Sequence, residues 1–322
     1  MTNNTLLVLA DPLEPQLSMM ETLKTEVNII VGNSAGAFEG VAAGAGAILN
    51  WSGPGSLLRE VFRKCPKVRW VHTRSAGVEG LLFPELVESS VTLTNGTGTF
   101  SPSLGEFVLA AILYFAKDLR RMIRNQAAGV WEPFDVMPIS DQTLGIIGYG
   151  DIGHAVASRV RPMGMRILAI KRHVPALHKD ELVEQIYSPD RRIEMLSRCD
   201  YVVATAPLTS ETRGMIGEPE FAALKPNAVV INVGRGPVID EEALIRALSE
   251  GRIKGAALDV FNHEPLPKDH PFYKLENVLL CPHCADHTHD WLDNAMQLFI
   301  AQFERFRRGQ PLMNVVDKKL GY

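Results

Sequence analysis

The chain has 322 residues, of which 46% are hydrophobic, and a formal net charge of -4. This length favours two domains, and the charge balance gives no basic field that would attract nucleic acid or an anionic lipid surface. No apolar run approaches the ~20 residues of a membrane helix, and the amino terminus from Met1 to Asn4 lacks the pattern of a secretory signal.

The first hundred residues alternate short apolar runs with polar or helical stretches. The runs cover residues 6–9, 27–31, 47–49, 68–71 and 91–93. This alternation is typical of a parallel α/β sheet. A longer helix is predicted next, with Ser101 as N-cap, Pro102 at the first helical position and apolar residues at helical spacing. We expect this helix to connect two domains.

From Thr143 the alternation resumes with clearer boundaries. Strands are predicted over residues 144–147, 166–170, 201–204 and 228–232, and helices near 152–160, after a Ser188 cap, and from Asp240 to Gly251. A final helical pattern at about 289–309 is expected to pack back on the first domain. We therefore predict the α/β class with two Rossmann-like domains and doubly wound parallel sheets, one flavodoxin-like (1–100 plus 288–322) and one from 101 to 287.

Three glycines, Gly148, Gly150 and Gly153, form a G-x-G-x-x-G motif between an apolar strand and a helix. Glycines at such a junction allow a tight turn, and the helix amino terminus offers free N–H groups to a pyrophosphate. We interpret the motif as a dinucleotide site that includes Asp151 and Ile152, the alternative being a purely structural turn.

The second strand of this unit ends in Lys171 and Arg172. Proteins that bind NAD usually place an acid here for the ribose 2'-hydroxyl, whereas two cations can pair with the 2'-phosphate of NADP. We predict a preference for NADP(H), with NAD(H) possible if the two cations are only a solvated loop pair.

Three later segments each carry one chemically useful residue: Arg235 in INVGRGPVID, Glu264 in GAALDVFNHEPLP and His283 in NVLLCPHCADHT. Together with RSAGVEG at 74–80 and APLTSETRGMI at 206–216, they resemble the D-isomer-specific 2-hydroxyacid dehydrogenase family. This family includes glyoxylate and hydroxypyruvate reductases and phosphoglycerate dehydrogenases. The resemblance covers nearly the whole chain.

The resemblance implies an NAD(P)-dependent enzyme with a substrate-binding domain (1–100 plus 288–322), a cofactor domain (101–287), an active site in the interdomain cleft and a homodimer formed through the cofactor domain. It also implies catalysis by Arg235, Glu264 and His283. By resemblance alone, Asp259 lies near the nicotinamide and Pro207 along the cofactor. Asp259 could instead cap its strand, and Pro207 could simply end one.

The side chains suit the reduction of a 2-oxo acid. His283 can protonate the carbonyl oxygen, and Glu264 can hydrogen-bond the other ring nitrogen and fix its orientation. Arg235 can bind the substrate carboxylate and polarise the carbonyl. Further contacts to the carboxylate are predicted from the backbone N–H groups of Ser75, Ala76, Gly77 and Val78.

Cys281 and Cys284 have the spacing of a thiol–disulfide oxidoreductase motif, which is a second possible function. The motif follows a strand late in the chain instead of starting a helix, so we set it aside. The neighbouring histidines and Asp286 would suit zinc, but a catalytic His283 cannot also be a committed ligand, and we expect no metal. Four cysteines are too few for a disulfide scaffold, so we expect a cytoplasmic protein, with an organelle left open.

A third possible function is that of a dinucleotide-sensing binding protein that does not turn over substrate. The presence of all three catalytic residue types argues for turnover. Asp286 departs from the family pattern, in which an apolar residue, alanine and glycine usually follow the histidine. We favour glyoxylate or hydroxypyruvate as the substrate and reduction as the direction.

Overall fold

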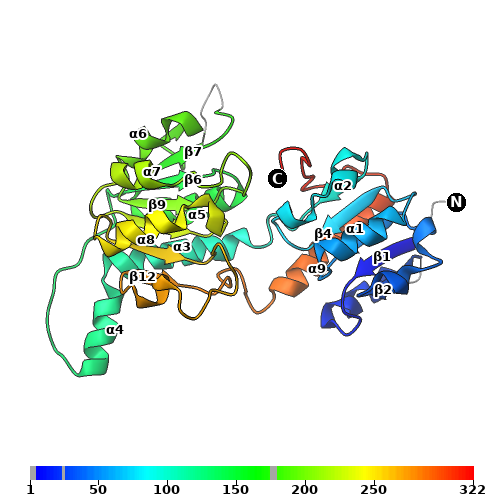
Figure 1. The fold of residues 1–322 in the computed structure, drawn as a ribbon, viewed down its shortest axis with the longest axis horizontal. Helices are drawn as coiled ribbons and strands as arrows, with labels where there is room; N and C mark the ends of the chain where they lie inside the picture. The colour runs from blue at the N-terminus through cyan, green and yellow to red at the C-terminus, as the bar shows by residue number, and fades with distance from the viewer. Residues whose placement is uncertain (1–4, 24–25, 175–179) are drawn as a thin grey trace. The chain divides into compact units, whose positions relative to one another are not determined.

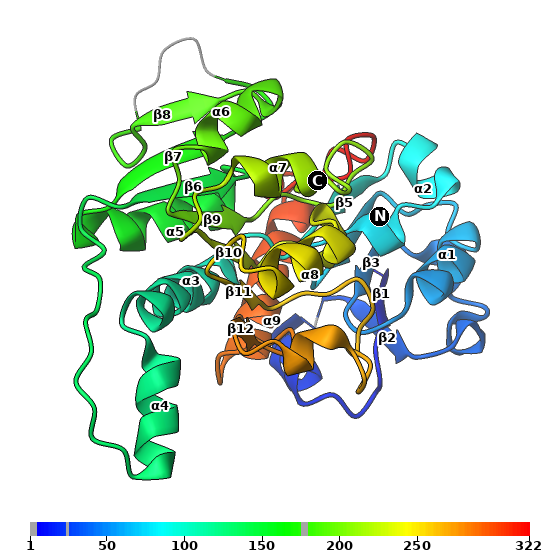
Figure 2. The same cartoon turned by 60° about the vertical axis from the view of Figure 1, so that its left-hand side comes forward.

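The computed structural model describes residues 5–23, 26–174 and 180–322. The chain divides into two compact units, which Figures 1 and 2 show from two directions. Unit 1 comprises Met1–Phe100 and Thr288–Tyr322, and unit 2 comprises Ser101–His287. Each unit is built on a parallel sheet, which confirms the predicted α/β class.

Unit 1 contains a five-stranded sheet in the order β2-β1-β3-β4-β5, the flavodoxin-like order. Its strands are β1 (Thr5–Leu9), β2 (Asn28–Gly32), β3 (Ala47–Asn50), β4 (Trp70–Thr73) and β5 (Thr92–Thr94). The interior strand β1 is covered on both faces, so its residues Leu6, Leu7, Val8 and Leu9 are all fully buried. The predicted strands are present, and their ends differ from the prediction by at most two residues.

The helices of unit 1 bury apolar side chains against this sheet. They are α1 (Gly55–Arg63), α2 (Pro84–Glu88) and α9 (Trp291–Arg307), with 3-10 segments η1 (Pro15–Leu23), η2 (Ala35–Phe38), η3 (Ala42–Gly44) and η4 (Glu79–Leu81). Helix α9 brings the carboxy-terminal segment back to unit 1, where Phe299 stacks on Trp70 at 5.7 Å between ring centroids. The expected carboxy-terminal helix is therefore present and packs on unit 1.

Unit 2 contains a seven-stranded sheet in the order β12-β11-β10-β9-β6-β7-β8. The strands are β6 (Thr143–Ile147), β7 (Arg166–Ile170), β8 (Gln185–Tyr187), β9 (Tyr201–Ala204), β10 (Val229–Asn232), β11 (Gly255–Leu258) and β12 (Val278–Leu280). Sequence analysis did not define β8 or β11. β8 has only three residues, and β11 begins with small residues because a Cβ on Gly255 would lie 2.4 Å from the Phe115 ring.

The helices of unit 2 are α3 (Ser101–Ala116), α4 (Leu119–Ala128), α5 (Asp151–Val160), α6 (Arg192–Leu196), α7 (Glu218–Ala223) and α8 (Glu241–Ser249). Shorter 3-10 segments are η5 (Arg161–Met163), η6 (Pro189–Arg191), η7 (Gly236–Val238) and η8 (Pro271–Lys274). Helix α8 follows the prediction: Asp240 caps it by accepting from the Ala243 N–H at 3.0 Å, and Gly251 follows it with a φ of 67°.

Ser101 was wrongly predicted as a cap, whereas Ser188 holds its predicted N-cap position without a capping hydrogen bond. Ser101 is the first residue of α3 itself, and its hydroxyl donates to the Asp151 carboxylate instead of capping the helix. Ser188 precedes a 3-10 turn, and its side chain makes no capping hydrogen bond. At Ser101 a distant acceptor takes the hydroxyl, which the local sequence does not reveal. No helix in the described part of the chain is long and apolar enough to cross a membrane.

Candidate active site

Six of the predicted site segments follow parallel strands of the unit 2 sheet. They are the glycine turn after β6, Lys171 and Arg172 after β7, Pro207 after β9, Arg235 after β10, Asp259 after β11 and His283 after β12. Because these strands are parallel neighbours, the six segments lie along one edge of the sheet. The strand order reverses between β9 and β6, so the glycine turn lies at the topological switch point, where such sheets bind ligands.

The three glycines of the turn have different physical requirements. Gly148 has a φ of 100°, and a Cβ there would lie 2.6 Å from the Ala206 backbone. A Cβ on Gly153 would lie 2.8 Å from the Gly148 carbonyl oxygen, so this glycine permits close packing of α5 on the turn. A Cβ on Gly150 would meet no described protein atom within 4 Å. Gly150 thus faces open space at the amino terminus of α5.

The pair Lys171 and Arg172 follows β7 directly, as predicted. Lys171 is exposed, and Arg172 is half-buried and forms an ion pair with Glu211. Glu211 lies in the segment APLTSETRGMI, and its side chain is 70% exposed. Sequence analysis missed Glu211, because its contact with Arg172 joins two loops 39 residues apart.

His283 and Glu264 form a direct pair, as the sequence predicts. His283 Nδ1 lies 2.6 Å from Glu264 Oε2, and Glu264 Oε1 accepts a hydrogen bond from the Phe261 N–H at 2.9 Å. The side chains are 47% and 34% exposed respectively. With Nδ1 bonded to the carboxylate, the proton on that nitrogen is fixed and Nε2 is the ring atom left for a substrate.

Arg235 lies in a loop that packs against the segment before Glu264. The Asn232 amide donates to the Arg235 carbonyl at 3.0 Å, and the Gly234 N–H donates to the Asn232 side chain at 3.1 Å. Next to Arg235, a Cβ on Gly236 would lie 2.1 Å from the Phe261 carbonyl carbon. The backbones that carry Arg235 and Glu264 are therefore in close contact.

Asp259 holds the loop that carries His283. Its side chain is almost fully buried, and Oδ1 accepts from the N–H groups of Cys284 and Ala285 at 3.0 and 3.1 Å. Ser103 of α3 donates to the Ala285 carbonyl at 2.6 Å. Asp259 thus ties the end of its own strand β11 to the loop after the neighbouring strand β12. Pro207 is exposed, and its carbonyl accepts from the Thr212 hydroxyl at 2.6 Å.

The predicted carboxylate loop lies in unit 1, directly after β4. The Gly96 N–H donates to the Ser75 carbonyl at 3.0 Å, and the Asn95 amide donates to the Ala76 carbonyl at 2.6 Å. These contacts hold the carbonyl groups, whereas within the described residues the N–H groups of residues 75–78 make no hydrogen bond. These N–H groups therefore have no protein acceptor among the described residues and are open to a ligand.

Comparison with known proteins agrees with this geometry. Residues 109–285 match the model of the D-isomer specific 2-hydroxyacid dehydrogenase, NAD binding domain. A glyoxylate reductase of Korarchaeum cryptofilum is 33% identical over 270 residues, which are 81% of this chain and 80% of that protein. A glyoxylate reductase of Thermococcus litoralis is also 33% identical, over 273 residues and the same shares of the two chains. The chain belongs to the D-isomer-specific 2-hydroxyacid dehydrogenase family.

Solved structures of this dehydrogenase family have the same fold. A family member from Xanthobacter autotrophicus, in complex with NADPH and MES, matches with a TM-score of 0.86 and 29% identity over 99% of both chains. An NADPH-dependent glyoxylate/hydroxypyruvate reductase from Sinorhizobium meliloti, in complex with NADP and sulfate, matches with a TM-score of 0.85 and 26% identity, over 99% of this chain and 100% of that one. The present dehydrogenase is an NAD(P)-dependent oxidoreductase. This function takes the place of the two alternatives considered from the sequence, a dinucleotide-sensing binding protein and a thiol–disulfide oxidoreductase.

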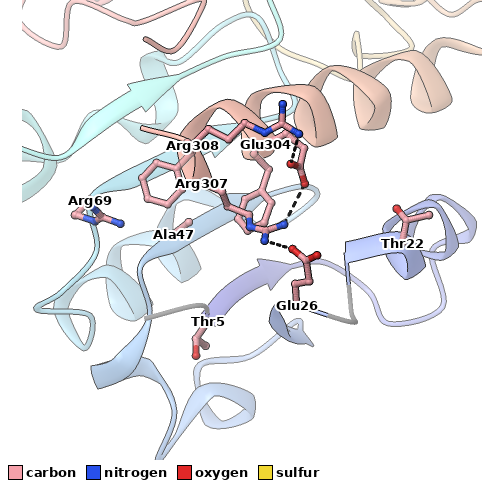
Figure 3. Close-up of a pocket in the computed structure, with 10 residues that line it drawn as sticks. Thr5, Thr22, Glu26, Ala47, Arg69, Glu304, Arg307 and Arg308 are labelled. Carbon is pink, nitrogen blue, oxygen red and sulfur yellow. Dashed lines mark hydrogen bonds and ion pairs between the residues drawn. The ribbon is translucent and has the colours of Figure 1, made fainter. Parts of the chain in front are cut away.

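The dehydrogenase also has a cavity of about 380 Å³ in unit 1, shown in Figure 3. Thr5 and Ala47 begin β1 and β3, so this cavity lies at the amino ends of the strands, at the sheet edge opposite the loop after β4. Its Arg307 and Arg308 form ion pairs with Glu26 and Glu304. Since these acids neutralise the arginines and the cavity is remote from residues 75–78, we do not assign substrate binding to it.

The histidine loop carries one further acid, Asp286. Burial raises the pKa of Asp286, and its Oδ1 has no hydrogen-bond partner among the described residues. Its neighbour His287 lies 3.7 Å from that oxygen. No group of three or more metal-ligating side chains occurs in the ranges that the structure describes.

Proposed function

We propose that this dehydrogenase reduces a small 2-oxo acid, glyoxylate or hydroxypyruvate, with NADPH as the preferred donor. The observation that carries the proposal is the His283–Glu264 pair, 2.6 Å apart, on the same sheet edge as the glycine turn. A histidine oriented by a carboxylate suits proton transfer to a carbonyl oxygen. The names of the glyoxylate reductases among its relatives support the substrate class.

The residues present fit a dinucleotide. The open space at Gly150 leaves room for the close approach of a pyrophosphate to the backbone, and α5 begins directly after this glycine. Asp151 and Ile152 form the first turn of that helix and belong to the same contact region. We assign residues 101–287 the cofactor role and residues 1–100 plus 288–322 the substrate role. Pro207, exposed after β9, is assigned to the cofactor edge.

The preference for NADPH rests on Lys171 and Arg172. Their charges suit a 2'-phosphate, and neither position offers the acid that would receive a free ribose hydroxyl. The family members crystallised with NADPH and NADP are consistent with this assignment. Because Arg172 is paired with Glu211, a 2'-phosphate must share or displace that ion pair. NADH is therefore expected to bind, but with a lower kcat/KM.

The chemistry assigns one task to each side chain. When bound, the nicotinamide supplies the hydride that attacks C2 of the oxo acid. Protonated His283 gives its Nε2 proton to the carbonyl oxygen as negative charge develops there, while Glu264 holds Nδ1 and stabilises the positive ring. Arg235 donates N–H bonds to the substrate carboxylate and polarises the carbonyl. Asp259 accepts from two backbone amides of the histidine loop and thereby fixes the position of the loop that carries His283.

The N–H groups of residues 75–78 are proposed as the second contact of the substrate carboxylate. Their carbonyl groups are held by Gly96 and Asn95, so the N–H groups are fixed before an anion binds. Fixed donors lose little entropy on binding, which favours binding of the carboxylate that all 2-oxo acids share. Ser75, Ala76, Gly77 and Val78 therefore select the carboxylate, and the rest of the pocket selects its substituent.

We also propose that the enzyme is a homodimer formed through the segment around α4. Helix α4 extends away from the sheet of unit 2 in both cartoon views (Figures 1 and 2). Exposed apolar side chains lie on this helix and in the segment that follows it: Ile123 is 62% exposed, Trp131 97% and Met137 57%. Light scattering of the wild-type enzyme should give the mass of a dimer. The double variant that combines Ile123→Glu and Trp131→Glu should give the mass of a monomer. A monomeric wild-type enzyme would contradict the assignment.

The experiment that tests the function is a comparison of kcat/KM for glyoxylate, hydroxypyruvate, pyruvate and phenylpyruvate with NADPH and with NADH. We expect glyoxylate or hydroxypyruvate with NADPH to give the highest value. Replacing both Lys171 and Arg172 by serine should reduce the NADPH value and leave the NADH value nearly unchanged. Equal losses with both nucleotides would contradict the proposed role of the two cations.

A further inference from the structure

Two cysteines flank His283 in the loop after β12. The Sγ atoms of Cys281 and Cys284 lie 3.6 Å apart, and both residues are partly exposed. We propose that this pair is a modification site at which a peroxide converts the two thiols into a disulfide that switches off the reductase until a dithiol reduces it. The effect on activity rests on the proposed function, whereas formation of the disulfide does not.

The geometry requires only a small movement. A disulfide has an S–S distance of ~2.05 Å, so the two sulfur atoms must approach by about 1.5 Å. The C-x-x-C spacing is also the one at which protein dithiols commonly cycle between the two states. The other two thiols are different: Cys65 and Cys199 are buried, so a peroxide in solution does not reach them. Oxidation is therefore expected to be selective for the loop pair.

The two steps balance with one peroxide. Burial and the neighbouring Asp259 carboxylate raise the pKa of Cys281, so Cys284 is the first nucleophile. Its sulfur attacks a peroxide oxygen: the S–O bond forms, the O–O bond breaks, and water leaves with the thiol proton. Cys281 then attacks that sulfur, the S–S bond forms, and the hydroxyl leaves as water with the second proton. Two thiols lose two electrons, and hydrogen peroxide is reduced to two water molecules.

The disulfide acts on catalysis through the backbone of His283. This residue lies between the two cysteines and has a φ of 52°, a conformation that a non-glycine residue keeps only when its surroundings hold it. The holding contacts are the Asp259 bonds to Cys284 and Ala285 and the 2.6 Å contact to Glu264. Drawing Cys284 towards Cys281 strains them. A displacement of ~1 Å at a catalytic group lowers a rate by about 10²-fold.

The disulfide itself is tested by mass spectrometry on the full-length protein. Trypsin should release residues 275–305 as one peptide that carries Cys281 and Cys284 without Cys65 or Cys199. After brief treatment with hydrogen peroxide, we expect this peptide to lose two hydrogen atoms and to regain them with dithiothreitol. A peptide that stays reduced, or that gains oxygen atoms without a cross-link, would overturn the proposal.

The switch is tested on the same samples by NADPH-dependent reduction of glyoxylate. We expect the wild-type rate to fall by about 10²-fold with cross-linking and to recover with dithiothreitol. Cys284→Ser should keep its basal activity and lose this reversible inactivation, whereas the matched control Cys65→Ala should still show it. Cross-linked enzyme with full activity, or Cys284→Ser that is inactivated and rescued like the wild type, would overturn the switch. Cross-linking in a protein that reduces no 2-oxo acid would instead contradict the proposed function.

Discussion

His72 in the core of unit 1 gives a quantitative prediction of how stability depends on pH. It is 1% exposed, and its Nδ1 lies 2.7 Å from the Thr94 hydroxyl, which accepts from the Trp70 indole N–H at 2.8 Å. Its Nε2 has no hydrogen-bond partner in the described part of the chain. Burial lowers the pKa of His72 from 6.5 to about 3. The folded protein therefore keeps this ring neutral at pH values where the unfolded chain protonates it.

The sign and size follow from proton linkage. Below pH 6.5 the unfolded chain binds one more proton at His72 than the folded protein, so stability falls as the pH falls. The loss is ~1.4 kcal/mol per pH unit, or about 2 kcal/mol between pH 6.5 and pH 5.

The assay is urea unfolding at pH 7 and pH 5, followed by tryptophan fluorescence, for the wild type and His72→Gln. The rings of Trp70 and His72 are tilted by 53° with centroids 5.8 Å apart, so Trp70 reports on unit 1 directly. Glutamine removes the titrating ring, so the variant should lose about 2 kcal/mol less than the wild type between the two pH values, whatever its starting stability. Equal losses in the two proteins would refute the reasoning.

Three further predictions concern the site. Gly150→Ala should leave Tm unchanged, because its Cβ meets only open space, but should weaken NADPH binding about tenfold or more, because that space is the proposed pyrophosphate site. Gly148→Ala should lower both Tm and the affinity for NADPH, since the φ of Gly148 is 100°. Both effects are measured by nucleotide titration and thermal melting. Glu264→Gln should lower kcat by about 10²-fold or more and leave the Kd for NADPH unchanged, measured by steady-state kinetics and titration. Glu211→Gln should tighten NADPH binding by at most about fivefold, because it releases Arg172 from an exposed ion pair worth ~1 kcal/mol or less.

Each of these predictions has an internal control. A lowered Tm for Gly150→Ala would show that the residue is needed by the fold and not by the nucleotide. An equal loss of NADPH affinity and kcat in Glu264→Gln would mean that the carboxylate shapes the cofactor site. For Glu211→Gln, the NADH affinity should stay constant, and a parallel gain for NADH would contradict a link to the 2'-phosphate.

Local sequence signals predicted the parts of the fold that local physics determines. The glycine turn after β6 needs a positive φ and close packing, and Asp240 caps α8 through a contact only three residues away. Such requirements are visible in a short segment. The order of the site segments along one sheet edge follows in turn from each lying after a parallel strand.

Contacts between distant segments were outside the reach of these signals. Ser101 reads as a cap, but Asp151, 50 residues away, accepts its hydroxyl. The Arg172–Glu211 pair depends in the same way on two loops meeting in space. β11 was missed because alanine and glycine are weak strand formers, and its burial between β10 and β12 overrides that preference.

His283 as the proton donor is the central claim, and one measurement tests it most directly. The rate of NADPH-dependent glyoxylate reduction is compared for the wild type and His283→Ala, with the Kd for NADPH determined on the same samples. We predict that the variant binds NADPH as tightly as the wild type and loses at least about 10²-fold in kcat. A variant that binds NADPH normally and turns over glyoxylate at the wild-type rate would contradict it.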